Sequence, residues 1–344
     1  MNTKEFEGTK GITLIALIIS ILILLILAGV TLQLAVGEDG IIRKAIVARE
    51  QHKAAEENEK LQLAVATALT KGKGIISMEK LNRALKEQFG NESEVQTNCG
   101  GWVYKKGKSY IIFLDGKIEE KVNGKLPTAF EEVEYIESTG TQYIDTKYIP
   151  KTNTELRLEI SFSGNFNNAT DGRTTIFQAM NNDRAYVFSL NFGGDSNQSK
   201  QLFAWIDKVW SGNYADVQMI DISDTIKNNK NLITMKSGKI TYGTVSRTLF
   251  EKTVDNDRSL FLLGNRSSNG NIVTFKAYNA KVYSLKLLEG DDLKRDFLPC
   301  YCTQEIIDVD GKTCPSGTIG LYDLVEDQFY TNQGTGTFLK GEDV

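Results

Sequence analysis

The sequence predicts a multidomain chain with an N-terminal transmembrane α-helix, a small α+β head and a C-terminal all-β sandwich. Residues 12–36 form an uncharged, strongly apolar run. Between residues 37 and 122 the pattern changes from helical apolar spacing to short strands separated by turns. From Phe130 onward, strand-like segments recur about every 8 to 12 residues with Gly, Asn and Asp between them, which is typical of a β-sandwich or barrel.

The composition is that of a chain that folds and does not bind nucleic acid. Of the 344 residues, 24% are charged and 41% are hydrophobic, as in ordinary globular proteins. The formal net charge is -4 at pH 7, and no stripe of Lys and Arg with interleaved aromatic residues is present. We therefore exclude nucleic acid as a partner and expect folded domains behind the apolar run.

The apolar run at residues 12–36 predicts a membrane-spanning helix. It contains no Asp, Glu, Lys or Arg and would be roughly 37 Å long as a helix, at about 1.5 Å per residue. That length exceeds the hydrocarbon core of a bilayer, which is about 30 Å thick. A helix buried in a soluble domain would show one polar face, and this run shows none. The membrane is therefore the first expected partner.

The polar leader at residues 1–11 ends in Lys10 and Gly11, immediately before the apolar run. A secretory signal peptide is cut after its hydrophobic region, whereas this break precedes it. Gly11 followed by Ile12-Thr13-Leu14-Ile15 resembles the prepilin-type leader of type IV pilins and pseudopilins. The resemblance implies that prepilin peptidase cuts after Gly11 and that Ile12 becomes the methylated N-terminus. It also implies that the helix anchors the protein and assembles with other pilin subunits.

Ala16 departs from the pilin pattern, in which a glutamate usually stands five residues after the cut. In the family this carboxylate pairs with the N-terminal amine of a neighbouring subunit, since an unpaired charge in apolar surroundings is costly. Some minor, tip-located members also lack it. Ala16 therefore favours a minor pilin or pseudopilin over a major pilin. It also keeps open an uncleaved membrane tether with a structural or interaction role.

Residues 37–122 predict a pilin-like head. Two glycines within Gly37–Gly40 break the apolar run, and an amphipathic helix is expected from Ile41 to about Thr70. Ser77 is expected to cap a second helix over Met78–Phe89. A small antiparallel sheet, with a hairpin turn at Asp115-Gly116, and then a linker over residues 123–130 should follow. The expected strands of this sheet are 102–104, 109–114 and 117–122.

The sandwich is expected to occupy residues 131–344 as one domain. In Thr154–Ile160 charged and apolar side chains alternate, which predicts one solvated and one buried face. No helix of substantial length is expected here. Further strands are expected at 175–179, 185–191, 201–206, 232–236, 260–263, 276–287 and 318–323.

Two stretches at the ends of this domain carry a second resemblance. They are YIESTGTQYIDT at residues 135–146, and GTIGLYD, FYTN and GTG at residues 317–323, 329–332 and 334–336. Both are similar to the laminin G-like, concanavalin A-like jelly rolls that occur on bacterial and phage surface proteins. The resemblance implies a lectin-like fold and surface glycans or proteins as partners, although fold alone does not assign a ligand.

Trp210 and its neighbours are the candidate glycan site. Sugar binding needs a flat aromatic ring beside hydrogen-bonding side chains. Trp210, Asn213 and Tyr214 are expected on one loop with Asp207 nearby. The alternative is that these aromatic residues pack in the core or at a sheet edge.

A Ca²⁺ site is the one cofactor that the sequence raises. Calcium takes hard oxygen ligands, which Asn167, Asn168 and Asp171 could supply from the loop NFNNATDG. An ordinary polar turn is the alternative.

Four cysteines, Cys99, Cys300, Cys302 and Cys314, raise either a disulfide or free thiols. A bridge that closes the loop from Cys302 or Cys300 to Cys314 suits a protein outside the cell. A structural zinc site is not expected, because the single histidine, His52, lies far upstream.

Catalysis is not expected. The lack of histidine in the C-terminal two thirds removes most acid/base and triad chemistry. The nearest glycosidase-like pattern is Glu155-x-Arg157-x-Glu159, in which the arginine interrupts the paired carboxylates. We therefore expect a non-catalytic, membrane-anchored surface protein that displays a lectin-like sandwich for adhesion or glycan binding. An uncleaved tether and an envelope glycosidase are the alternatives.

Overall fold

The structure is a computed structural model that describes residues 14–36, 40–74, 76–90, 94–98, 101–106, 108–122, 124–163, 174–180, 187–192, 201–206, 218–221, 229–249, 257–266, 272–274 and 279–344. The chain divides into two compact units, Met1–Ala64 and Val65–Val344. An N-terminal apolar helix and a body rich in antiparallel sheet, as the sequence predicts, are both present.

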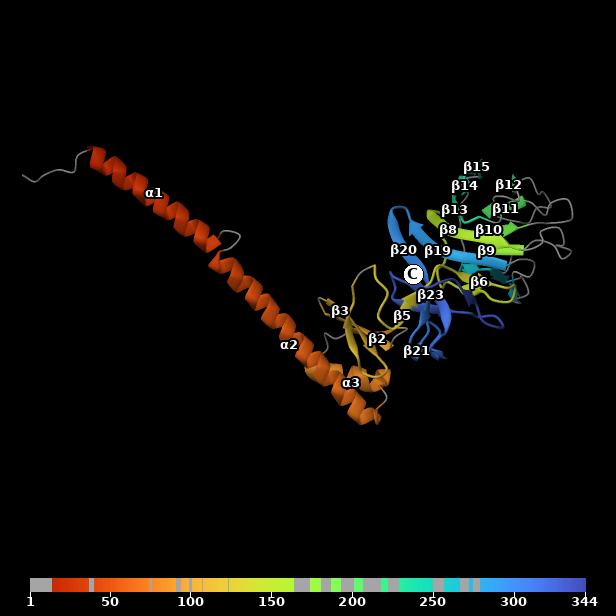
Figure 1. Ribbon diagram of the computed structural model, residues 1–344, viewed down its shortest axis with the longest axis horizontal. Coiled ribbons are helices and arrows are strands. Elements are labelled where there is room, and N and C mark those ends of the chain that lie inside the picture. The colour runs from red at the N-terminus through yellow and green to blue at the C-terminus, as the bar shows by residue number, and fades with distance from the viewer. Residues whose placement is uncertain are drawn as a thin grey trace, which may run out of the picture. The chain divides into compact units, whose positions relative to one another are not determined.

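The first unit consists of helix α1 and most of helix α2 (Figure 1). Helix α1 spans Leu14–Val36 and α2 spans Ile41–Gly72. Helix α1 thus ends before, and α2 begins after, the position at which the sequence predicts a break. The predicted start of the second helix at Ile41 is therefore confirmed, and its end lies two residues beyond the predicted Thr70.

The second unit begins with the end of α2, helix α3 (Met78–Phe89) and a four-stranded antiparallel sheet in the order β1-β2-β3-β4. Ser77 caps α3 as predicted, since its side chain accepts a hydrogen bond from the backbone of Lys80. The ring of Phe89 on α3 lies 5.0 Å from that of Tyr104 on β2. The strand bounds are β1 Glu94–Asn98, β2 Gly101–Lys106, β3 Lys108–Phe113 and β4 Ile118–Glu120.

The hairpin predicted at Asp115-Gly116 connects β3 to β4 and sits against the end of α2. Gly116 has a φ of +87°, which a side chain would strain. A Cβ on Gly116 would lie 2.3 Å from the side chain of Leu69 and 3.4 Å from that of Val65. Glycine therefore allows both the turn and the close approach of helix and sheet.

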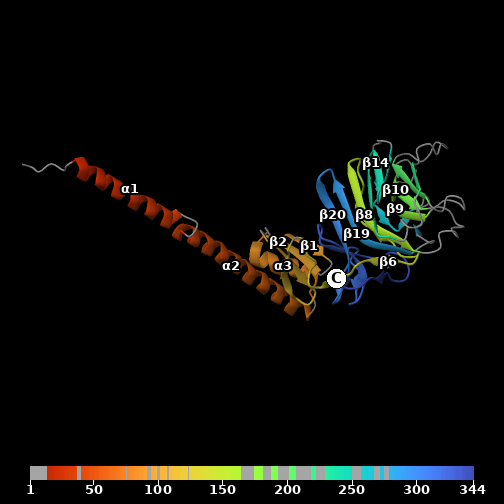
Figure 2. The same ribbon diagram turned by 45° about the horizontal axis from the view of Figure 1, so that its top comes forward.

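The remainder of the second unit contains two large antiparallel sheets (Figure 2). Among the described residues, the larger has eleven strands and follows the path β15-β14-β13-β8-β19-β20-β23-β24, with β5, β6 and β25 paired beside it. Its strands are β5 Phe130–Glu132, β6 Ile136–Ser138, β8 Thr154–Ser163, β13 Asn231–Lys236, β14 Lys239–Tyr242, β15 Val245–Thr248, β19 Asn279–Glu289, β20 Asp292–Cys302, β23 Ile319–Asp323, β24 Gln328–Thr331 and β25 Leu339–Lys340.

The smaller sheet has the order β12-β11-β10-β9-β16-β7, six strands within the described ranges. Its strands are β7 Ile144–Asp145, β9 Thr174–Met180, β10 Val187–Phe192, β11 Gln201–Ile206, β12 Gln218–Asp221 and β16 Phe261–Leu262. Two short hairpins complete the unit: β17 Gly264–Arg266 with β18 Ile272–Thr274, and β21 Ile306–Ile307 with β22 Thr313–Cys314.

One hydrophobic core joins the two large sheets, as in a β-sandwich. It contains Leu156, Leu158 and Ile160 of β8 together with Phe177 of β9 and Leu190 of β10, all with no measurable exposure. The charged residues of β8 are partly or fully exposed, so the predicted alternation in Thr154–Ile160 is confirmed. Burial of apolar area at about 25 cal/mol per Å² is the main force that holds such sheets together.

Strand β20 was not predicted, because Pro299 and several charged residues interrupt its pattern. Pro299 lies beyond the part of β20 that pairs with β19, because the hydrogen-bonded pairing of these two strands ends at Leu285 and Phe297. Pro299 then faces Leu321 on β23, and its carbonyl accepts a 3.0 Å hydrogen bond from the backbone of Val133. The missing backbone N–H of proline therefore costs β20 no pairing with β19.

Within the segment predicted as a linker, residues 123–130, Ala129 and Phe130 are buried. A second hydrophobic cluster joins Phe113 of β3 to Phe130, Tyr322 and Phe329, with Leu126 packed against it. The buried ion pair of Lys121 and Asp327 adds a 2.5 Å contact between the end of the head sheet and the β23–β24 turn. The domain bounds 37–122, 123–130 and 131–344 stay predictions.

Candidate functional site

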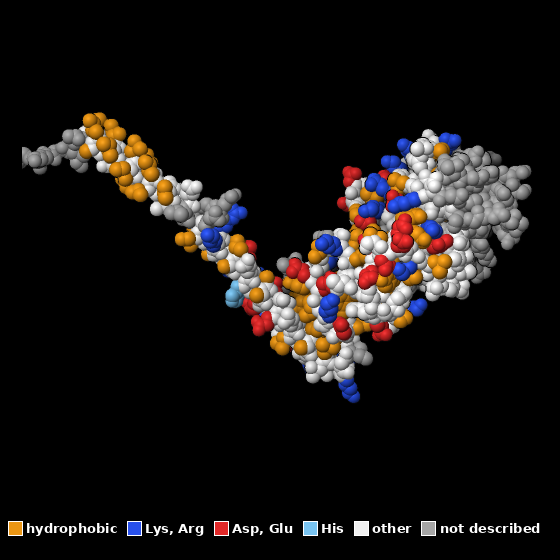
Figure 3. Space-filling view, in the orientation of Figure 1, with side chains coloured by type: hydrophobic (Ala, Val, Ile, Leu, Met, Phe, Trp, Pro, Cys, Tyr) orange, Lys and Arg blue, Asp and Glu red, His pale blue; other side chains and the backbone are white. Residues whose placement is uncertain are grey.

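Helix α1 has the properties of a membrane-spanning helix. Its 18-residue window Leu14–Thr31 has a mean hydropathy of 3.1, and none of it is buried in the protein. Hydrophobic side chains cover the visible face of α1 in Figure 3. Its 23 residues reach roughly 35 Å, which suits a hydrocarbon core of about 30 Å. By length and composition alone, a signal sequence would pass the same test.

The hydroxyl groups of α1 are satisfied within the helix. The Oγ of Ser20 donates to the carbonyl of Ala16 at 2.8 Å, and the Oγ1 of Thr31 donates to the carbonyl of Leu27 at 2.7 Å. In a hydrocarbon environment an unsatisfied polar group costs several kcal/mol. These internal bonds therefore let both residues face lipid.

Most sequence-predicted site residues lie outside the described residues. The processing residues Gly11 and Ile12 precede the first described position, Leu14. The candidate glycan and calcium sites also lie outside the described residues. They consist of Asp207, Trp210, Asn213 and Tyr214, and of Asn167, Asn168 and Asp171. These sites stay predictions. In the part of the chain that the structure describes, no group of three or more His, Cys, Asp or Glu residues could hold a metal ion.

Cys302 and Cys314, for which the sequence left a disulfide and free thiols as alternatives, are both buried free thiols in the structure. Each is turned toward its own acceptor: the Sγ of Cys302 lies 3.1 Å from the carbonyl of Pro315, and the Sγ of Cys314 lies 3.6 Å from that of Lys312. Burial raises the pKa of Cys302 and, with the nearby charge of Asp308, raises the pKa of Cys314 to about 12. Both thiols are therefore protonated and unreactive at neutral pH.

Both glycosidase-like carboxylates on β8, Glu155 and Glu159, form ion pairs with basic side chains. Glu155 accepts from the Nε of Arg157 at 2.6 Å and lies 3.7 Å from Lys236. Glu159 pairs with Lys230 at 3.0 Å and accepts from the Oγ of Ser284 at 3.2 Å. Such pairing is the property of a solvated strand face.

An aromatic pair on the same sheet is already covered. The rings of Tyr135 and Tyr283 lie 5.5 Å apart in a T-shaped arrangement. The ammonium of Lys281 sits 4.1 Å from the centre of the Tyr135 ring, and that of Lys230 sits 4.8 Å from the centre of the Tyr283 ring. Because each ring is engaged in a cation–π contact, this pair is not an open stacking platform.

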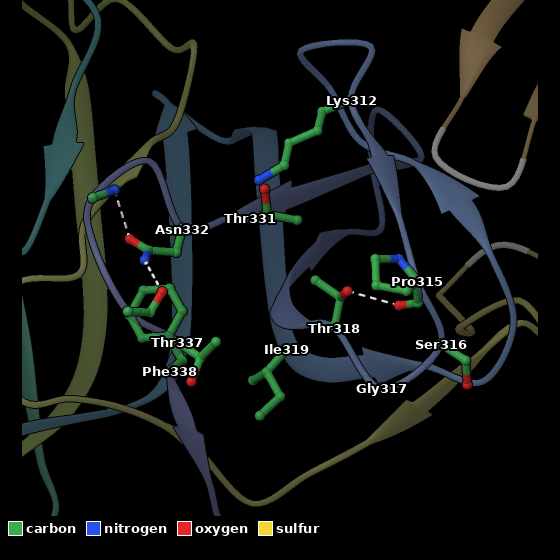
Figure 4. A pocket seen from close by; sticks show the side chains of 12 residues that line it. Lys312, Pro315, Ser316, Gly317, Thr318, Ile319, Thr331, Asn332, Thr337 and Phe338 are labelled. Atoms are coloured by element: carbon green, nitrogen blue, oxygen red, sulfur yellow. Dashed lines mark hydrogen bonds between the residues drawn. The ribbon is translucent and has the colours of Figure 1, made fainter.

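A pocket of about 430 Å³ lies beside the adjacent strands β23 and β24 of the large sheet. It is lined by the loop before β23 and by the loop between β24 and β25. Figure 4 shows Asn332, Thr337 and Phe338 on one side and Pro315 and Thr318 on the other. The full lining is Lys312, Pro315, Ser316, Gly317, Thr318, Ile319, Thr331, Asn332, Gly334, Gly336, Thr337 and Phe338.

The loop at residues 332–338 is held by the distant segment around Gln142. The Nε2 of Gln142 donates to the carbonyl of Thr337 at 3.0 Å, and the Oγ1 of Thr141 donates to that of Thr335 at 2.8 Å. A Cβ on Gly334 would lie 1.9 Å from the carbonyl oxygen of Thr141. The two stretches that carry the lectin-like resemblance therefore contact each other. Their hydrogen bonds hold the 332–338 loop, which is one wall of the pocket, in place.

The opposite wall, at residues 315–318, is also fixed by hydrogen bonds. The backbone N–H of Gly317 donates to the carbonyl of Cys302 at 2.7 Å. The Oγ of Ser316 donates to the carbonyl of Thr303 at 2.9 Å, and the Oγ1 of Thr318 donates to that of Pro315 at 2.7 Å. Both walls are thus preorganised, which lowers the entropic cost of binding a ligand.

Asp308 does not line the pocket but holds two residues that do, Lys312 and Thr331. This buried carboxylate accepts from the backbone of Asp310 and Lys312 and, at 2.6 Å, from the Oγ1 of Thr331. Thr331 and Lys312 thereby hold their places in the lining, where the Lys312 side chain extends toward Thr331 in the view of Figure 4.

The sequence analysis did not identify this pocket. It singled out the glycine-rich stretch 334–336 and the segment 135–146 as signs of a fold, but not as parts of one site. Comparisons with models of known protein families and with curated proteins found no match to this chain.

Proposed function

We propose that this chain is a non-catalytic, pilin-like surface protein. In this proposal α1 anchors the chain in the membrane, and the C-terminal sandwich is displayed outside the cell for adhesion, with surface glycans as ligands. The observation that carries the proposal is α1: 23 predominantly apolar residues without a charge, exposed wherever their burial is described. A free soluble helix of this kind would be an aggregation hazard, whereas a bilayer satisfies it.

The elements that follow α1 support the pilin-like part of the proposal. A long helix, a short capped helix and a four-stranded antiparallel sheet come next in chain order. This is the layout expected of a pilin head. The residues Gly11 and Ile12 at the start of the apolar run supply the expected processing junction. In this proposal, prepilin peptidase and other pilin subunits are the protein partners.

A jelly-roll, lectin-like assignment of the C-terminal part belongs to the same proposal. It is supported by the shared core of two antiparallel sheets and by the meeting of the 135–146 and 332–338 segments. Neither feature assigns a ligand by itself. The pocket between the 315–318 and 332–338 loops gives the proposal a place where a ligand can bind.

An uncleaved membrane tether is the second candidate function. Ala16 favours it, because the carboxylate that pairs subunits in a pilus is absent at this position. Such a tether would carry the same sandwich at the surface without entering a filament.

Mass spectrometry of the protein isolated from membranes distinguishes the two. The pilin-like function predicts a mature chain that begins at a methylated Ile12. Gly11→Val should abolish the cut, whereas Gly8→Val, a matched change in the same leader, should not. A wild-type chain that begins at Met1 with an unmodified Ile12 would overturn the processing step and favour the tether.

A further inference from the structure

We propose that the pocket between the 315–318 and 332–338 loops binds an uncharged carbohydrate unit. This inference rests on the proposed function and deepens it, since it names the site and the ligand class. The pocket volume of about 430 Å³ falls within the range of about 300 to 1,000 Å³ that small-molecule sites show.

The hydroxyl groups of the pocket act as hydrogen-bond acceptors toward a ligand. The protons of Ser316, Thr318 and Thr331 are already donated to protein oxygens at 2.9, 2.7 and 2.6 Å. A hydroxyl whose proton is committed still has lone pairs to accept a bond. A ligand that satisfies these three oxygens must therefore supply donors, which is what the O–H groups of a sugar do.

Donors for the ligand come from two other side chains. The ammonium of Lys312 makes no ion pair within the described ranges, and the Oγ1 of Thr337 makes no hydrogen bond there. Asn332, by contrast, is saturated, since its amide donates to the carbonyl of Gly336 at 2.8 Å and accepts from the backbone of Gly334 at 2.7 Å. The two available donors match the ring and hydroxyl oxygens of a sugar.

Apolar surface completes the pocket. Ile319 is partly buried and offers apolar surface in the lining, whereas Phe338, which is 1% exposed, backs this wall from the core. A sugar ring has C–H faces that pack on such surface while its hydroxyls are oriented by polar groups. A small polar ion would leave this surface unused.

The charges behind the pocket favour a neutral ligand. The Asp308 carboxylate lies one hydrogen bond behind Thr331, and Asp310 lies in the same turn. Lys147 neutralises Asp310 across 2.8 Å, but Asp308 is satisfied by hydrogen bonds without a cation partner in the described chain. The Asp308 carboxylate offsets the charge of the Lys312 ammonium in the lining, and a phosphate or carboxylate would have no proton to donate to the three acceptor oxygens, so an uncharged ligand fits better than an anion.

The experiment uses the full chain in detergent micelles. It is applied to an array of immobilised neutral hexose and N-acetylhexosamine disaccharides, with uronic-acid disaccharides alongside. The strongest neutral disaccharide is then titrated by calorimetry against the four variants that follow and against Trp210→Ala. Lys312→Ala should weaken binding at least about tenfold, and Thr337→Val about threefold to tenfold, as expected for a charged and a neutral hydrogen bond. The matched changes Lys239→Ala and Thr248→Val, at exposed positions on β14 and β15, should leave binding unchanged.

The outcomes separate this inference from the proposed function. Binding to neutral disaccharides that survives both pocket variants but is lost in Trp210→Ala would overturn the pocket and keep the adhesive function. Preference for the uronic-acid disaccharides would overturn the neutral ligand class. Loss of all sugar binding in the wild-type chain would overturn both the pocket and the glycan part of the function. Thermal unfolding of each variant checks that an effect on binding is not an effect on folding.

Discussion

The buried carboxyl of Asp323 gives a quantitative test of the structure. Asp323 is fully buried at the end of β23, and burial raises its pKa from 3.8 to about 6. The Nε of Arg295 lies 3.3 Å from Oδ2 of Asp323, but without hydrogen-bond geometry, so Oδ2 has no hydrogen-bond partner among the described residues. The attraction of Arg295 therefore only partly offsets the cost of burying the charge.

The sign of the pH dependence follows from this shift. The folded chain binds the proton of Asp323 more tightly than the unfolded chain, because its pKa is higher when folded. The stabilisation is complete below about pH 3.8 and is lost as the pH rises through about 6. The difference between these two pKa values corresponds to about 3 kcal/mol, at about 1.4 kcal/mol per pH unit.

Asp323→Asn removes the titrating group, and with it this pH dependence of stability, but keeps a side-chain oxygen in the place of Oδ1. The amide oxygen of Asn can still accept from the backbone of Asp296 and Val325, as Oδ1 does now at 2.9 and 3.1 Å. The free energy of unfolding of the variant, relative to wild type, should therefore rise by about 3 kcal/mol between about pH 4 and pH 8.

Urea unfolding of the full chain in micelles, followed by fluorescence at both pH values, measures the effect of Asp323→Asn. Asp291→Asn, which removes an exposed carboxylate from the β19–β20 turn, is the control and should leave the wild-type pH dependence in place. If the difference between Asp323→Asn and wild type is the same at both pH values, the reasoning about burial is refuted.

Three further predictions concern the anchor, the pocket wall and the thiols. Leu25→Arg places a charge near the centre of α1 and should shift the chain out of the membrane fraction, because insertion then costs about 2.5 to 3.5 kcal/mol more. Gly334→Ala puts a Cβ 1.9 Å from a backbone oxygen and should lower the free energy of unfolding by about 1 to 3 kcal/mol, measured in urea. Cys302 and Cys314 should react with a thiol reagent at pH 7 only after unfolding, since both are buried with raised pKa values.

The first two of these predictions have a control in the same chain. Leu25→Phe keeps α1 apolar and should stay in the membrane fraction. Gly72→Ala, in helix α2 with no atom closer than 3.8 Å to its new Cβ, should be neutral or stabilising. Leu25→Arg that remains fully membrane-bound, Gly334→Ala that is as stable as wild type, or rapid thiol labelling of the folded chain would contradict the respective prediction.

The elements that sequence reasoning predicted well are those with a local cause. The α1 helix follows from an uninterrupted apolar run, the start of α3 from the Ser77 cap, and β8 from its alternating side chains. Each of these signals lies within a few residues of the element that it predicts. Strand β20 was missed because local rules penalise Pro299, and only the tertiary pairing with β23 and Val133 makes that position tolerable.

The pocket could not be predicted, because one of its walls is held in place by a segment that is distant in the sequence. The contact of Gln142 with Thr337 joins residues 195 positions apart. The value of Lys312 as a free donor depends on which acids lie near it, and Asp308 is committed to Thr331 and to backbone groups. Residue types and spacing favoured the aromatic segment around Trp210 as the glycan site, whereas the pocket in the structure is lined largely by hydroxyl-bearing residues and glycines.

Display of residues 65–344 on the outer surface of the cell is the claim on which the remaining proposals depend. Mild proteolysis of intact cells, with antibodies against that unit and a cytoplasmic marker protein as the control, tests it most directly. We predict that the unit is cut while the marker stays intact. Protection of the unit until the membrane is permeabilised would contradict the proposed topology and the adhesive function with it.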